Sequence, residues 1–132
     1  MRGASALQKV LGEHAGLPLR VFVVWEPVIT TDIAPPTTAK LGLIHDLRAI
    51  QYWDHDRALS QDMMRAVLAN PSRYHLGEDL DEDAIVWDAV ALFPKGVIWE
   101  QDVPVPSYYG SPVVEAVSSL PEALIKTASS AE

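Results

Sequence analysis

A chain of 132 residues, with 48% hydrophobic and 21% charged residues, is composed like a single globular domain with its own core. Its formal net charge of −8 argues against a nucleic-acid partner, because basic side chains bind a phosphate backbone. The absence of cysteine excludes disulfides, thiol redox chemistry, thiolate catalysis and cysteine-bound zinc from this sequence. The longest apolar run is far below the roughly 18 residues that cross a bilayer. The first residues also lack the apolar stretch of a secretory signal, so we expect a cytoplasmic protein without a membrane partner.

The predicted elements are organised around one apolar strand, Leu19–Trp25. Its β-branched and aromatic residues are typical of a strand that is covered on both faces. A helical pattern over Gly3–His14 precedes it, and a loop rich in proline and threonine follows from Pro27 to Thr38. This order predicts an α/β domain in which Leu19–Trp25 is the first interior strand.

The middle of the chain predicts a short helix over Thr38–Leu47, a short strand over Ala49–Trp53 and a well-patterned helix over Arg57–Ala69. Asn70-Pro71 ends that last helix. The loop 72–83 closes with the acid run 78–83, which lacks the glycine and the distant glutamate of a calcium loop. We therefore interpret the acid run as solvated loop.

The last third of the chain predicts an antiparallel hairpin, because two strand patterns flank three turn residues. The strands are Ala84–Phe93 and Val97–Glu100, around the turn 94–96. A Pro/Tyr loop over Asp102–Gly110 follows, and then a helix over 111–119 that starts with serine and proline. The remaining residues, from Pro121, hold one further turn of helix and a fraying end.

Two stretches, taken with this order of elements, resemble a thioredoxin-like fold of the peroxiredoxin-related type. Gln51–Asp54 followed by Asp56-Arg57 is similar to that family's inserted strand, which ends in an aspartate before a helix. Trp87–Gly96 is similar to the family's hairpin. The resemblance implies an α/β fold with one small mixed sheet flanked by helices. It places a single thioredoxin-like domain over residues 1–120 and a C-terminal tail over 121–132.

The departures from the family concern its redox centre. The strand and the Cys-x-x-Cys pair that precede the first helix in this family are missing here, as is the proline before the hairpin. Since the missing strand is central in the family, either the Leu19 strand pairs directly with the hairpin or another protomer fills the gap. We therefore expect a homodimer, with an interface at that edge or at Val103–Tyr109.

Two pairs of tryptophan and acid give the first candidate site. Trp25-Glu26 ends one predicted strand and Trp87-Asp88 lies in another. The thioredoxin-like layout implies that both pairs lie near the end of the sheet where open α/β sheets bind ligands. Two carboxylates beside two indoles suit acid–base chemistry or ligand binding. The structural alternative is that the indoles belong to the core and the carboxylates are solvated strand ends.

The triplet Asp54-His55-Asp56 gives the second candidate site, since a histidine beside carboxylates suits a general base. The structural alternative is that Asp54 or Asp56 caps the following helix while His55 is a solvated turn residue. The candidate catalytic residues are thus Glu26, Asp88 and His55, and the candidate ligand-binding residues are Trp25, Trp87 and Asp54.

No cofactor and no metal ion are expected, because the sequence has no phosphate-binding glycine motif and no paired histidine spacing. Two functions remain open. The first is a non-redox thioredoxin-like protein that binds a protein or a small-molecule ligand. The alternative is a small hydrolase that acts on an ester or lactone, with water activated by a carboxylate or by His55.

Overall fold

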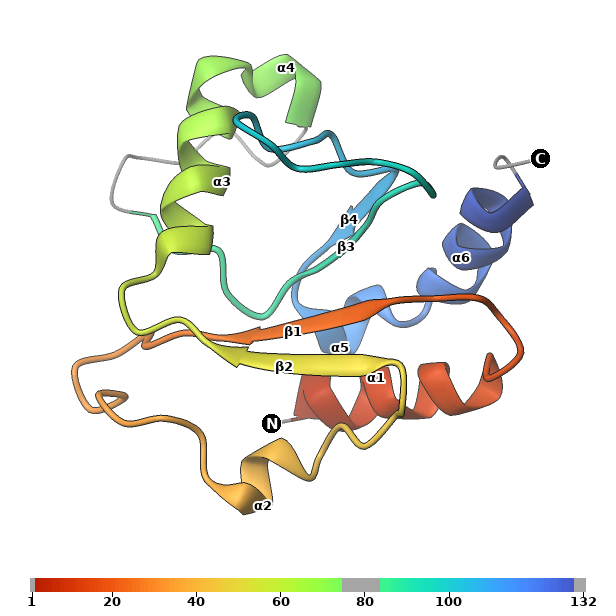
Figure 1. Cartoon of the computed structure of the whole chain (residues 1–132), viewed down its shortest axis with the longest axis horizontal. Helices are drawn as coiled ribbons and strands as arrows, with labels where there is room; N and C mark the ends of the chain where they lie inside the picture. Colours follow the sequence, from red (N-terminus) through yellow and green to blue (C-terminus); the bar gives the residue numbers. More distant parts are fainter. Residues whose placement is uncertain (1, 75–83, 130–132) are drawn as a thin grey trace.

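The computed structural model describes residues 2–74 and 84–129, in which short helices alternate with two small sheets (Figure 1). The acid run 78–83 lies outside the described residues. The elements are α1 (Arg2–Glu13), β1 (Val21–Trp25), α2 (Thr38–Leu41), β2 (Ala49–Trp53), α3 (Ala58–Ala69), α4 (Pro71–Tyr74), β3 (Val90–Leu92), β4 (Tyr108–Gly110), α5 (Val113–Ala116) and α6 (Leu120–Ser129).

β1 and β2 form a two-stranded parallel sheet, with Val21 opposite Ala49 and Trp25 opposite Trp53. Both strands lie where their β-branched and aromatic patterns predict them. The expectation that β1 is covered on both faces is wrong, because Phe22 is 58% exposed. In the parallel pairing, Phe22 of β1 shares one face of the sheet with Ile50 and Tyr52 of β2. No other element of the described chain covers that face fully.

β3 and β4 form a separate antiparallel sheet, with Val90 opposite Gly110. The predicted hairpin between 84–93 and 97–100 is therefore wrong. The predicted turn does form, since Gly96 has a φ of +85° and the Val97 N–H donates to the Pro94 carbonyl. Beyond the turn, however, residues 97–102 are exposed and join no sheet of the described chain, Val103 is buried, and the chain returns to β3 at Tyr108.

Tertiary packing explains why β3 pairs with 108–110 instead of the nearer 97–100 strand pattern. The Tyr108 hydroxyl donates to the Ala116 carbonyl at the end of α5, which fixes β4 against the C-terminal helices. Val103, 5% exposed, packs with Met63 and Val67 of α3. These long-range contacts outweigh the local preference for a tight hairpin.

The single mixed sheet that the family resemblance implies is absent from the described residues, because β1 pairs with β2 and not with β3. The end of β1 and the segment before β3 are nevertheless connected through Ser60. Its hydroxyl bonds both Glu26, which follows β1, and Val86, which precedes β3. The α/β class is confirmed, in the form of two two-stranded sheets with helices around them (Figure 1).

Several helices differ from their predicted lengths. α2 stops at Leu41, well before the predicted end at Leu47, and α4 follows α3 after Asn70. α6 extends over ten residues, where only one further turn of helix and a fraying end are expected from residue 121. It is held by Leu120 and Leu124, which pack with Val10 of α1 in the larger apolar cluster. No helix in the described ranges combines the length and apolarity needed to span a membrane.

Arg48 joins α1 to the start of β2. Its guanidinium donates to the carbonyls of Leu11, His14 and Leu17, which satisfies acceptors at the C-terminal end of α1. It also forms a two-point ion pair with Asp46. The hydrogen bonds from Arg48 lower the pKa of the Asp46 carboxyl to about 2. This connection fixes the parallel sheet against α1.

Candidate functional site

The polar centre of the molecule lies at the carboxyl ends of β1 and β2, where Glu26 and Asp54 follow the two strands. α3 rises from this end of the sheet (Figure 1). Asp54 accepts a hydrogen bond from the Leu59 N–H at 2.8 Å, and Glu26 accepts one from the Ser60 N–H at 3.2 Å. The two carboxylates therefore cap α3, whose N-cap residue, Arg57, provides no side-chain cap.

Ser60 connects this carboxylate cluster to the chain before β3. Its side chain is almost completely buried, with an exposed fraction of 2%. The hydroxyl donates to Glu26 Oε2 over 2.5 Å and accepts from the Val86 N–H over 3.1 Å. A buried hydroxyl with both donor and acceptor in use is a structural bridge, and here it joins β1, α3 and the segment before β3.

The pKa of the Glu26 carboxyl is raised above its ordinary value of 4.5. Burial is the main cause, since it disfavours the charged form, and the nearby carboxyl of Asp54 adds to it. The hydrogen bonds from Ser60 act in the opposite direction. Such a carboxyl suits proton transfer, but both of its oxygens already accept hydrogen bonds from Ser60.

Trp25 and Trp53 lie side by side in the sheet register, directly before the two carboxylates. The Trp25 indole N–H donates to the Gln51 side chain at 2.9 Å, and Gln51 in turn donates to the carbonyls of Leu41 and Ile44. The indole of Trp25 is thus fixed to the loop after α2. Trp53 faces the ring of His55 edge-on, with the ring centres 6.2 Å apart.

His55 lies on the solvent side of this end of the sheet. Its Nδ1 is 2.9 Å from the Asp56 carboxylate, and both side chains are mostly exposed. None of the hydrogen bonds of the described residues connects His55 to Glu26 or Asp54. The geometry matches the structural alternative for this triplet, in which Asp54 caps the helix and His55 is a turn residue.

Trp87 and Asp88 do not occupy the place that the sequence analysis assigns to them. β3 begins only at Val90, so both residues precede the strand, and Trp87 is 62% exposed. Asp88 has a positive φ of 49°, and its carboxylate lies beside Gly3 in the first turn of α1. The pair that accompanies Trp25-Glu26 is Trp53-Asp54, because a parallel register brings equivalent strand ends together.

Ser60 is the central residue that the sequence reasoning does not single out. Its position early in a predicted helix is ordinary, and its partner Glu26 is 34 residues away. One signal does exist: Asp54 precedes the helix, and a carboxylate near a helix start commonly accepts from its first N–H groups.

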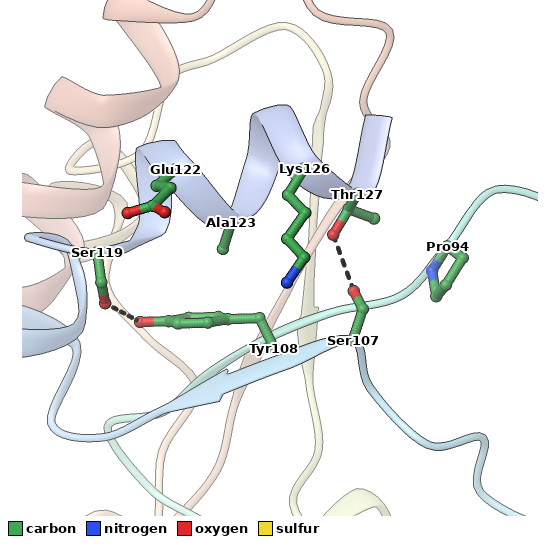
Figure 2. A pocket seen from close by; sticks show the side chains of 8 residues that line it. All are labelled: Pro94, Ser107, Tyr108, Ser119, Glu122, Ala123, Lys126 and Thr127. Atoms are coloured by element: carbon green, nitrogen blue, oxygen red, sulfur yellow. Dashed lines mark hydrogen bonds between the residues drawn. The ribbon is translucent and has the colours of Figure 1, made fainter. Parts of the chain in front are cut away.

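A shallow hollow of about 310 Å³ lies between β4 and α6 (Figure 2). The Tyr108 ring forms its floor, and Glu122, Lys126 and Thr127 project from α6 above it. Its hydroxyls are already paired with one another: Ser107 with Thr127, and Tyr108 with Ser119, each at 2.9 Å. A ligand here would have to compete with these internal bonds.

One side of the parallel sheet carries exposed apolar side chains. In β1 and β2 the side chains of Phe22, Val24, Ile50 and Tyr52 share one face, because their register positions are paired. We call these four residues the apolar face. Phe22 is 58%, Ile50 52% and Tyr52 50% exposed, and the Phe22 and Tyr52 rings lie 6.4 Å apart.

Comparison with known proteins adds no assignment, since no protein family, curated protein or solved structure matches the chain. Within residues 2–74 and 84–129, no three histidine or acidic side chains are grouped as a metal ion requires. What the geometry defines is an α/β chain with a capped, internally bonded carboxylate cluster and an exposed apolar sheet face.

Proposed function

We propose that this chain is a non-redox, thioredoxin-like binding protein whose partner is a protein segment that docks on the parallel sheet. The observation that carries the proposal is the apolar face. Three large side chains that are each at least half exposed, Phe22, Ile50 and Tyr52, stand together on one sheet. A contiguous apolar patch on a soluble chain is typical of a protein interface, and aromatic residues are enriched in such interfaces.

The carboxylate cluster supports binding rather than catalysis. Glu26 and Asp54 are engaged by the first N–H groups of α3, and the Ser60 hydroxyl is shared between Glu26 and Val86. A general base must direct a lone pair at its substrate, whereas the hydrogen bonds of Glu26 and Asp54 direct both carboxylates toward the start of α3. The cluster instead positions α3 and the strand ends, which holds the sheet in a fixed shape for a partner.

A display library of extended peptides tests this proposal on the purified chain. We expect enriched peptides to alternate apolar and polar residues, and Phe22→Asp to abolish their binding. Ile125→Asp is the matched control, because Ile125 on α6 is 56% exposed and Phe22 is 58% exposed. If no peptide is enriched, or if Phe22→Asp binds as well as the wild type, the apolar face is not a docking surface.

The hydrolase alternative keeps one specific observation in its favour, which is the raised pKa of Glu26 beside Asp54 and Ser60. An ester and lactone screen distinguishes the two functions when it is repeated on Glu26→Gln, Asp88→Asn and His55→Ala. Turnover that survives metal chelation and falls with Glu26→Gln supports the hydrolase. A loss only in Asp88→Asn or His55→Ala would place the chemistry outside the carboxylate cluster, and no turnover supports the binding protein.

A further inference from the structure

We propose that the partner is a second copy of this chain, whose segment Val97–Glu100 pairs as a strand with the free edge of β1. This inference rests on the proposed function and names its partner. Reciprocal exchange gives a closed two-fold dimer, in which each protomer donates one segment and accepts one. Two features that are incomplete within the protomer complete each other in this arrangement.

The first incomplete feature is the edge of β1. The Val21 N–H donates to the Arg48 carbonyl, and the Trp25 carbonyl accepts from the Asp54 N–H. A strand directs alternate residues to its two sides, so the N–H and C=O groups of Phe22 and Val24 point away from β2. We call these groups the free edge of β1. In the described parts of the chain they have no hydrogen-bond partner, although Ser60 holds the Val86 segment near the end of this strand.

The second incomplete feature is Val97–Glu100, which has the composition of a strand but no sheet partner among residues 2–74 and 84–129. Val97, Ile98 and Trp99 are all exposed, Ile98 to 73%. β-branched and aromatic side chains in a segment outside any sheet are suited to adding a strand to a sheet edge. The next apolar residue, Val103, stays buried against α3, so donation of the segment leaves the core intact.

Charge determines the direction of the proposed pairing. The carboxyl end of the parallel sheet is acidic, with Glu26, Asp54 and Asp56, whereas the exposed Arg20 precedes β1 at the other end. The donated segment follows Lys95 and ends at Glu100. An antiparallel alignment with β1 places Lys95 near the acidic end and Glu100 near Arg20. A parallel alignment reverses both contacts, and like charges would then face each other.

Light scattering coupled to gel filtration tests the proposal on the full chain over a range of micromolar concentrations. We expect a mass of twice 14.5 kDa for the wild type and a shift to monomer for Ile98→Glu. The dissociation constant should rise at least about 100-fold, because both copies of the segment change and each buried isoleucine accounts for more than about tenfold. Ile98→Pro should act in the same direction, since it removes a ladder donor and keeps an apolar side chain.

Ile33→Glu is the matched control, because Ile33 is 74% exposed on the loop after β1 and lies outside the proposed contact. It should leave the mass unchanged. Hydrogen exchange provides the second measurement: the Phe22 and Val24 amides should be protected in the wild type and lose at least about tenfold of that protection in Ile98→Glu. A monomeric wild type, or a dimer that survives both Ile98 variants, overturns the inference. If peptides still bind the apolar face in that case, the proposed function stands without it.

Discussion

Replacing Ser60 with alanine tests the bridge at the start of α3 most directly. The hydroxyl is buried, and it serves the Glu26 carboxylate and the Val86 N–H at once. A net hydrogen bond to a charged group contributes about 1.5–3 kcal/mol, and a buried donor without a partner costs about 1–3 kcal/mol. Because part of each cost is relieved by relaxation, we expect Ser60→Ala to lower the free energy of unfolding by about 3 kcal/mol. At roughly 4 °C per kcal/mol for a chain of this size, Tm falls by about 12 °C.

Urea unfolding followed by circular dichroism measures this change, and Ser118→Ala is its control. The Ser118 hydroxyl is also hydrogen-bonded, to the Glu115 carbonyl at 2.8 Å, but it is exposed and local. Its loss should cost less than about 0.5 kcal/mol. The loss in Ser60→Ala should also shrink in acid, where Glu26 is protonated and no buried charge loses its donor. A cost equal to that of the control would refute the bridge.

Three further results are expected. The pKa of Glu26 is raised by burial, so the stability gained from its protonated form is present below pH 4.5 and is lost as the pH rises through the folded-state pKa. Glu26→Gln, which stays neutral, should therefore match the wild type in acid urea titrations and exceed it at neutral pH. Arg48→Lys should lower the free energy of unfolding by roughly 2–4 kcal/mol, because it removes the forked donors at the end of α1. Arg65→Lys, which changes an exposed ion pair, should leave the free energy of unfolding unchanged in the same titration. Trp87→Ala should change Tm by no more than about 4 °C, since Trp87 is mostly exposed; a large loss would show that Trp87 is packed.

The parts of the fold that the sequence predicts are those with a strong local pattern. β1 and β2 follow runs of β-branched and aromatic residues, and α3 begins and ends within a residue of its expected range because its apolar spacing is regular. The partner of β3 has no such local signal. A turn at 94–96 is consistent with a tight hairpin and also with a long excursion, and the burial of Val103 under α3 selects the second.

The candidate site is predicted in part, for the same reason. Glu26 and Asp54 follow recognisable strands, so their place at one end of a sheet can be anticipated. Ser60 and the register partner Trp53 cannot, because their roles depend on which strands are neighbours. The expectation that Trp87-Asp88 accompanies Trp25-Glu26 came from a family layout with one continuous sheet, and the described chain has two.

The cap of α3 has a consequence for how the chain folds. A helix usually carries its own start signal, but Arg57 has a left-handed φ of 57° and no capping side chain, and α3 relies on carboxylates that follow β1 and β2. Asp54 can cap α3 locally, but Glu26 is 34 residues from Ser60, so α3 gains this second part of its N-terminal stabilisation only after the two parallel strands have come together. Helix and sheet are then one cooperative unit, so a fragment that begins at residue 57 should have little helix of its own, and the two elements should melt in one transition.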